Sequence, residues 1–124
     1  MLNVYPMIDE NGKISCKKAG TFSLALTFYT DNPPVTLRNF TGCSAKLVVK
    51  NAAGTAVLTF DSTASPVTIT LGGALGTLTL SQTSVTMAAL TAGEYVYDLR
   101  ITGSGGAVEF TQTAPFSVID NVTS

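Results

Sequence analysis

The chain has 124 residues, of which 45% are hydrophobic and 12% are charged, and its net charge is −1. A chain of this length can bury one hydrophobic core, and its charged fraction is about half of the roughly 25% usual in globular proteins. The weak net charge, without a dense basic stripe, disfavours a nucleic-acid-binding protein. No apolar run approaches the ~20 residues of a transmembrane helix, so we expect no membrane partner either.

Residues 1–19 differ from the rest of the chain and are predicted to form an N-terminal arm or hairpin. Asn11-Gly12 marks a turn, after which residues 14–17 could run as a return strand. The segment could instead add a strand to the sheet edge of a neighbouring subunit, although loop-length statistics favour the hairpin. Its apolar residues, which the core need not absorb, are the candidate partner-binding residues: Leu2, Val4, Tyr5, Met7 and Ile8.

Residues 21–80 alternate between apolar and polar side chains in several short runs, which is typical of half-buried strands. The runs cover residues 21–30, 45–49, 55–60, 66–71 and 78–80, and glycine, asparagine or proline separates them. The residues predicted to face the core are Phe22, Leu24, Leu26, Phe28, Ala45, Leu47, Val49, Val67, Ile69, Leu71, Leu78 and Leu80.

Residues 81–90 have helical spacing. Val85, Ala88 and Ala89 lie three and four positions apart, and Ser81 is a possible N-cap. We expect one or two helical turns that bridge two sheets.

The clearest strand lies at residues 94–101. Tyr95, Tyr97, Leu99 and Ile101 fall on one face, and the residues between them fall on the other. A tyrosine just after the Gly93 corner matches the tyrosine corner of immunoglobulin-like sandwiches, in which the hydroxyl turns back onto the corner backbone. With the final strands near residues 107–118, the chain predicts an all-β fold. Residues 20–124 are expected to form an immunoglobulin-like β-sandwich of about eight strands with one short helical turn.

The sequence offers little for catalysis. It contains no histidine, which removes the commonest general base, the usual nucleophilic triads and most zinc sites. Glu94 and Asp98 share a strand face, as a glycosidase pair or calcium ligands would, but a solvated charge row with an exposed ion pair is favoured because Arg100 lies nearby. Cys16 and Cys43 are expected to be free thiols. We therefore expect a protein that is not an enzyme, with no cofactor and no metal.

Five segments follow one another between residues 20 and 123, at 20–24, 39–50, 75–81, 90–100 and 116–123. The most specific are Gly-Glu-Tyr-Val-Tyr-Asp-Leu at 93–99 and the terminal Val122-Thr123. In this order they resemble the immunoglobulin-like domain of baseplate upper proteins and related virion proteins of tailed bacteriophages.

The resemblance implies a virion component of the neck, the tail and baseplate, or the head decoration, without catalytic activity. It implies other virion structural proteins as partners, and a homo-oligomer or symmetric ring. Because the N-terminus lacks the features of a secretory signal, we expect synthesis in the host cytoplasm before incorporation into the virion. The alternative is a carbohydrate-binding module for host attachment, for which Tyr5 and Tyr29 are the plausible exposed aromatics.

Overall fold

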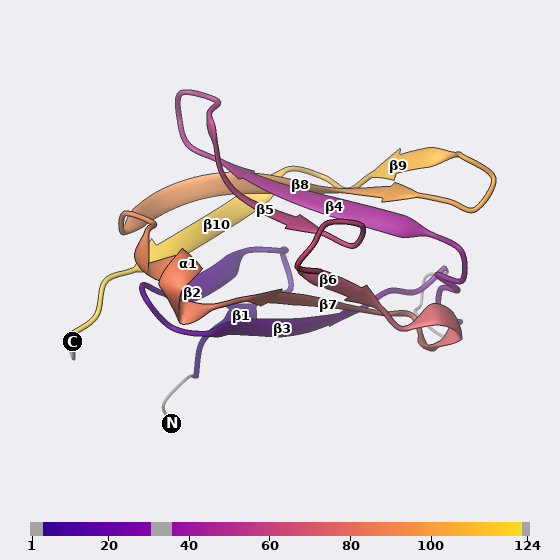
Figure 1. Cartoon of the computed structure of the whole chain (residues 1–124), viewed down its shortest axis with the longest axis horizontal. Coiled ribbons are helices and arrows are strands. Elements are labelled where there is room, and N and C mark those ends of the chain that lie inside the picture. Colours follow the sequence, from indigo (N-terminus) through magenta and orange to yellow (C-terminus); the bar gives the residue numbers. More distant parts are fainter. Residues whose placement is uncertain (1–3, 31–35, 123–124) are drawn as a thin grey trace.

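The computed structural model describes residues 4–30 and 36–122, which fold into two packed β-sheets with one short α-helix (Figure 1). Helix α1 (Ser84–Ala88) and a 3₁₀ turn, η1 (Gly73–Leu75), are the helical elements of this part of the chain. Its strands are β1 (Met7–Ile8), β2 (Ile14–Lys17), β3 (Phe22–Thr27), β4 (Ser44–Lys50), β5 (Ala56–Asp61), β6 (Ile69–Leu71), β7 (Thr77–Gln82), β8 (Gly93–Thr102), β9 (Val108–Phe110) and β10 (Ala114–Ile119).

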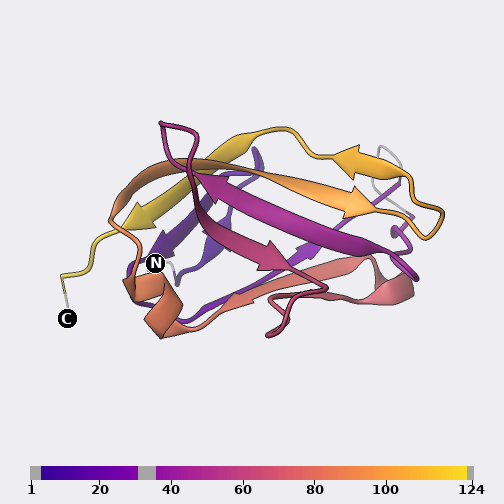
Figure 2. The same ribbon diagram turned by 45° about the horizontal axis from the view of Figure 1, so that its top comes forward.

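The two sheets pack face to face, with α1 at one end and the β8–β9 hairpin extending at the other (Figure 2). The larger sheet has the order β1-β2-β10-β8-β4-β5, with β9 also paired to β8, and the smaller sheet has the order β3-β7-β6. Strands β2 and β10 pair in parallel. The smaller sheet corresponds to strands B, E and D of an immunoglobulin domain, and β10-β8-β4-β5 correspond to G, F, C and C′. The predicted immunoglobulin-like sandwich is confirmed.

The described residues contain ten strands, and β3 to β10 lie in the segment from residue 20 onward, for which the sequence predicted about eight strands. The other two strands, β1 and β2, lie in the N-terminal segment that was predicted to form an arm or hairpin. Residues 7–17 form a β-hairpin, in which Met7 pairs with Ser15. The division of the chain between residues 19 and 20 stays a prediction.

In β3 and β8, buried or half-buried side chains alternate with more exposed ones, as the sequence predicted. Phe22 is buried and Leu24 and Leu26 are half-buried, while the residues between them are exposed. In β8 the residues of one face point inward. The buried hydrophobic core consists of Ile14, Cys16, Phe22, Phe40, Ala45, Leu47, Val49, Leu58, Phe60, Ile69, Leu78, Leu80, Met87, Leu90, Tyr97, Leu99, Ile101, Ala114, Phe116 and Val118.

The tyrosine corner is also confirmed. The Tyr95 hydroxyl donates a hydrogen bond to the carbonyl oxygen of Thr91 at 2.5 Å, so it closes the corner between α1 and β8. Two residues further on, where antibody domains carry the second cysteine of their inter-sheet disulfide, this chain has Tyr97. Its ring packs edge-to-face on Phe116 at a centroid distance of 6.3 Å. Because β8 and β10 are paired neighbours in the larger sheet, this contact lies within one sheet, unlike the inter-sheet disulfide of antibody domains.

The predicted helical face is wrong. Val85 is 80% exposed, Ala88 and Ala89 are exposed too, and the buried residue of α1 is Met87. Strand β7 continues through residue 82, so Ser81 lies in a strand. The N-cap is Thr83, whose side chain accepts from the backbone N–H of residue 86. The helix starts two residues later than a Ser81 N-cap would place it. Because each residue turns the helix by about 100°, this later start changes which side chains face the core.

The predicted inward position of Val67 is wrong as well. Strand β6 begins at Ile69, and Val67 is 53% exposed in the loop before it. The neighbouring Thr68 fixes this loop, because its hydroxyl accepts a hydrogen bond of 2.7 Å from the backbone N–H of Asp61.

Both cysteines are free thiols, as the sequence predicted. Cys16 lies in the core, where its thiol donates to the carbonyl oxygen of Ser117 at 3.6 Å, and Cys43 is half-buried. Burial raises the pKa of the Cys16 thiol from 9.0 to about 11. At pH 8 the Cys16 thiolate is therefore about a thousandth of the total, so this side chain is chemically inert in the folded protein.

We expect iodoacetamide at pH 8 to alkylate Cys43 at least about tenfold faster than Cys16 in the folded protein, because Cys16 is covered and protonated. Peptide mass spectrometry over a time course measures both rates. In urea the two residues should react alike. Equal rates in the folded protein would contradict the burial of Cys16, and a mass 2 Da lower, from a disulfide, would contradict the free thiols.

Replacing Tyr97 by phenylalanine removes the hydroxyl that donates to the carbonyl oxygen of Gly12. We expect Tyr97→Phe to lower the free energy of unfolding by about 1 kcal/mol, since the part-buried carbonyl loses this donor. Urea denaturation measures the change. Tyr29→Phe is the control, because Tyr29 is 45% exposed, and it should change the stability by less than about 0.5 kcal/mol.

Candidate interaction surfaces

The apolar residues predicted to bind a partner lie on the β1–β2 hairpin and on the segment that leads into it. Val4 is 85% exposed, whereas Tyr5 and Met7 are half-buried. Ile8 is half-buried and packs against the core. Leu2 lies outside the described residues. The hairpin therefore uses Ile8 for its own attachment and leaves Val4 on the surface.

Polar contacts hold the tip of this hairpin in one conformation. A carboxylate oxygen of Asp9 accepts from the backbone N–H groups of Asn11 and Lys13, both at 2.9 Å. The turn is joined to the larger sheet by the hydrogen bond from Tyr97 to Gly12. Burial and, secondly, the Asp9 carboxylate raise the pKa of Tyr97, so the hydroxyl keeps its proton and remains a donor. The hairpin is a fixed part of the sandwich, not a free arm.

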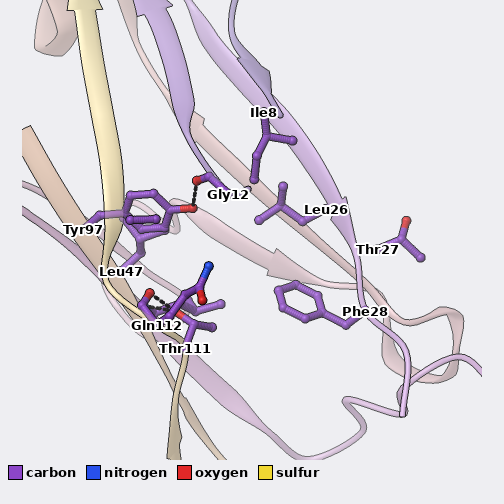
Figure 3. Close-up of a pocket in the computed structure, with 11 residues that line it drawn as sticks. Ile8, Gly12, Leu26, Thr27, Phe28, Leu47, Tyr97, Thr111 and Gln112 are labelled. Carbon is purple, nitrogen blue, oxygen red and sulfur yellow. Dashed lines mark hydrogen bonds between the residues drawn. The ribbon is translucent and has the colours of Figure 1, made fainter. Parts of the chain in front are cut away.

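A cavity of about 300 Å³ opens between the two sheets beside the hairpin (Figure 3). Ile8, Leu26 and Phe28 project into it from one side, and Tyr97 and Gln112 border it on the other. The remaining lining residues are Gly12, Thr27, Leu47, Leu99, Thr111 and Ala114. The lining contains no charged side chain. It can accept apolar groups, and its polar side chains are the hydroxyls of Thr27, Tyr97 and Thr111 and the amide of Gln112.

Strand β9 adds an apolar surface that the sequence analysis missed. Val108 is 53% exposed and Phe110 is 66% exposed, although both belong to a strand paired with β8. Between them, Glu109 forms an ion pair with the guanidinium of Arg38. Hydrogen bonding to Arg38 and its positive charge lower the pKa of Glu109. A run of three residues has too little periodicity to reveal which side chains point outward.

The carboxylates of β8 lie on the charged face of the larger sheet. Glu94 and Asp98 share the outward face as predicted, but Glu94 accepts a hydrogen bond from the Ser117 hydroxyl and lies 3.8 Å from the Lys13 ammonium. The ion-pair partner therefore comes from the hairpin and not from Arg100 in the same strand. Within residues 4–30 and 36–122, no three metal-ligating side chains gather.

The smaller sheet differs from the larger one in charge. Strands β3, β6 and β7 contain no aspartate, glutamate, lysine or arginine. Their outer face carries hydroxyl and methyl groups from Ser23, Ala25, Thr27, Thr70, Thr77, Thr79 and Ser81. The larger sheet, by contrast, has Lys46, Lys50, Glu94, Asp98 and Arg100 on its strands. One side of the sandwich is therefore neutral and the other charged. No helix of the described residues is long and apolar enough to cross a membrane.

No protein-family model and no curated protein matches the chain. Solved structures that resemble it include CopC from Methylosinus trichosporium OB3b, with 16% identity and a TM-score of 0.42, covering 85% of this chain and 99% of CopC. The extracellular domains 3–5 of Drosophila OTK have 15% identity and a TM-score of 0.36, over 95% of this chain and 38% of theirs. Murine CRIg has 9% identity and a TM-score of 0.38, over 88% of this chain and 92% of its own.

Proposed function

We propose that the protein is a non-enzymatic structural component of a tailed-phage virion, in the neck, the tail and baseplate, or the head decoration. It acts by binding other virion proteins and copies of itself, as a homo-oligomer or symmetric ring. It is made in the host cytoplasm and resides in the particle. The family resemblance of residues 20–123 supplies the phage assignment, and one structural observation supports assembly: an entire sheet of the sandwich has no charged residue.

The neutral sheet supports assembly because charged residues are depleted at the cores of protein interfaces. A charge that is buried against a partner loses its hydration, and it must be paired to recover the cost. Serine and threonine hydroxyls lose less hydration free energy than a charge does when they are buried, and they can form hydrogen bonds to a partner's backbone. The smaller sheet can therefore be covered at low cost, whereas the larger sheet would have to pair several charges.

The N-terminal segment supplies a second contact surface. Val4 is almost fully exposed, next to the half-buried Tyr5 and Met7. Because the hairpin that follows is fixed by the Tyr97–Gly12 hydrogen bond, these side chains are held at a defined place. A defined apolar position beside a rigid sheet suits a contact with another virion protein.

The carbohydrate-binding alternative depends on exposed aromatic rings. The Tyr5 ring is half-buried, and the Lys17 ammonium lies 5.9 Å from its centroid. Tyr29 is 45% exposed. A glycan array separates the two functions, because saturable binding to a defined sugar that Tyr29→Ala abolishes would favour the alternative.

The location of the protein is tested by mass spectrometry of purified particles from the phage that encodes it. We expect its peptides at a fixed stoichiometry to those of the major structural proteins after gradient purification. Their absence from the particles would overturn the proposed function, whatever the purified protein does in solution.

We expect Val4→Asp to reduce incorporation into particles at least about tenfold, because it places a charge in the apolar contact. Quantitative mass spectrometry of the particles measures incorporation. The matched control is Val85→Asp, at a position that is similarly exposed at 80% in the first turn of α1, where an acidic residue is well tolerated. Both variants should keep the wild-type melting temperature. Equal incorporation of the two would contradict a role for Val4.

A further inference from the structure

Strand β3 is one of the two edges of the smaller sheet, and β6 is the other. The sheet order β3-β7-β6 leaves one side of β3 without a neighbouring strand. In its ladder with β7, Phe28 just beyond the strand donates its backbone N–H to the carbonyl oxygen of Gly76 at 2.8 Å. In an antiparallel strand, the backbone N–H and C=O groups of every second residue point to the same neighbouring strand. The backbone groups of the even-numbered residues of β3 therefore bond to β7. The backbone groups of Ser23, Ala25 and Thr27 therefore point away from the sheet.

Natural sandwiches protect exposed edges with short strands, prolines, charges or covering side chains. Strand β1 has two residues and follows Pro6, and β6 has three. Strand β9 is short and carries Glu109. In β5 the carbonyl oxygen of Thr59 accepts from the Gln82 side chain at 3.0 Å. Strand β3 has six residues, Phe-Ser-Leu-Ala-Leu-Thr, without proline or charge. Of the edges that the structure describes, β3 is the one left open to pairing along its whole length.

We propose that a second copy of the chain pairs with β3 edge to edge, antiparallel, about a two-fold axis at Ala25. The two smaller sheets then form one continuous six-stranded sheet. This pairing places Ala25 opposite Ala25 of the second copy, and Ser23 opposite Thr27 of the second copy. All three outward-pointing residues of each strand thereby exchange backbone hydrogen bonds.

Charge favours a second copy as the occupant. The whole segment from Gly20 to Thr30 lacks charged residues, so an antiparallel copy of it brings no like charges together. Opposed like charges are the usual obstacle to self-pairing of strands. The edge is therefore complementary to itself in both hydrogen bonding and charge.

The core-facing side of the strand supports the same register. Leu24 and Leu26 point inward but stay half-buried, since the sandwich is open along this edge. Leu26 also borders the cavity between the sheets. With the two-fold axis at Ala25, Leu24 lies beside Leu26 of the second copy. Each strand thus extends the apolar layer of the other across the β3–β3 contact between the two copies, which we call the seam.

The seam joins two strands and does not bury the roughly 800 Å² per partner of a standard stable interface. We therefore expect a dimer that dissociates in the micromolar range. Sedimentation velocity of the purified wild-type protein from about 10 μM to about 1 mM should show a concentration-dependent monomer–dimer equilibrium. A wild-type protein that stays monomeric throughout this range would overturn the proposal.

The decisive variants change Ala25, whose side chain is exposed and does not pack in the core. We expect Ala25→Lys to weaken dimerisation at least about tenfold, because the two ammonium groups face each other on residues about 5.5 Å apart at Cα. Ala25→Glu should do the same. A 1:1 mixture of the two variants should recover a heterodimer, since the opposed charges then attract. Failure of the mixture to associate, with both variants folded, would overturn the two-fold pairing at Ala25.

The matched control is Thr70→Lys. Ala25 and Thr70 both pair with Thr79, one from each side, so they lie in the same row of the outer face, on opposite edges of the sheet. Thr70→Lys should leave dimerisation unchanged. A variant that lacks residues 1–5 should also dimerise like wild type, and loss of the dimer in it would assign the seam to the N-terminal segment and overturn the proposal.

This inference specifies the self-association that is part of the proposed function, and it is tested on the purified protein, separately from the assignment to a virion. Without self-association, the assignment to a virion would still stand on the mass spectrometry of particles. Conversely, a dimer with the predicted charge dependence would stand even if the protein were absent from particles.

Discussion

The two sheets are held together by a cluster of aromatic rings centred on Phe22. This side chain is 1% exposed and comes from the smaller sheet. It meets Phe60 of β5 at a centroid distance of 5.2 Å and Phe116 of β10 at 6.0 Å. Each such contact contributes about 0.5–1.5 kcal/mol beyond simple burial. Because both thiols are free, packing of this kind does the work that a disulfide does in antibody domains.

Away from this cluster, the sandwich is closed by polar contacts. The Tyr97 hydroxyl reaches the carbonyl oxygen of Gly12, and Gln112 donates from its side chain to the carbonyl oxygen of Asn11 at 3.4 Å. These bonds join the N-terminal hairpin to the larger sheet without filling the space beneath it. The cavity between the sheets is the result, and it lies beside the unpaired edge of β3. The cavity and the open strand edge are therefore neighbours.

Local periodicity was enough to predict the strands that dominate the core. Phe22 in β3 and Leu99 in β8 follow strict alternation over several residues, and the tyrosine corner at Tyr95 is a local signature. What failed depended on where an element begins, as with Met87 replacing the predicted face of α1. The exposure of Phe110 depends on pairing between strands, which no short pattern encodes. Likewise, the exposure of Val4 could be assigned only after the hairpin was placed on the sheet.

The division of charge between the sheets explains how a chain with few charges can present two different surfaces. The larger sheet keeps its charges on the outer face, where Lys46 lies opposite Arg100 in the β4–β8 ladder and diagonal to Asp98. Hydrated charges resist burial, so this face favours water. The smaller sheet has no such resistance, and its edge offers backbone groups as well. We therefore expect contact with the outer face and the β3 edge of the smaller sheet to cost less desolvation than contact with the charged outer face of the larger sheet.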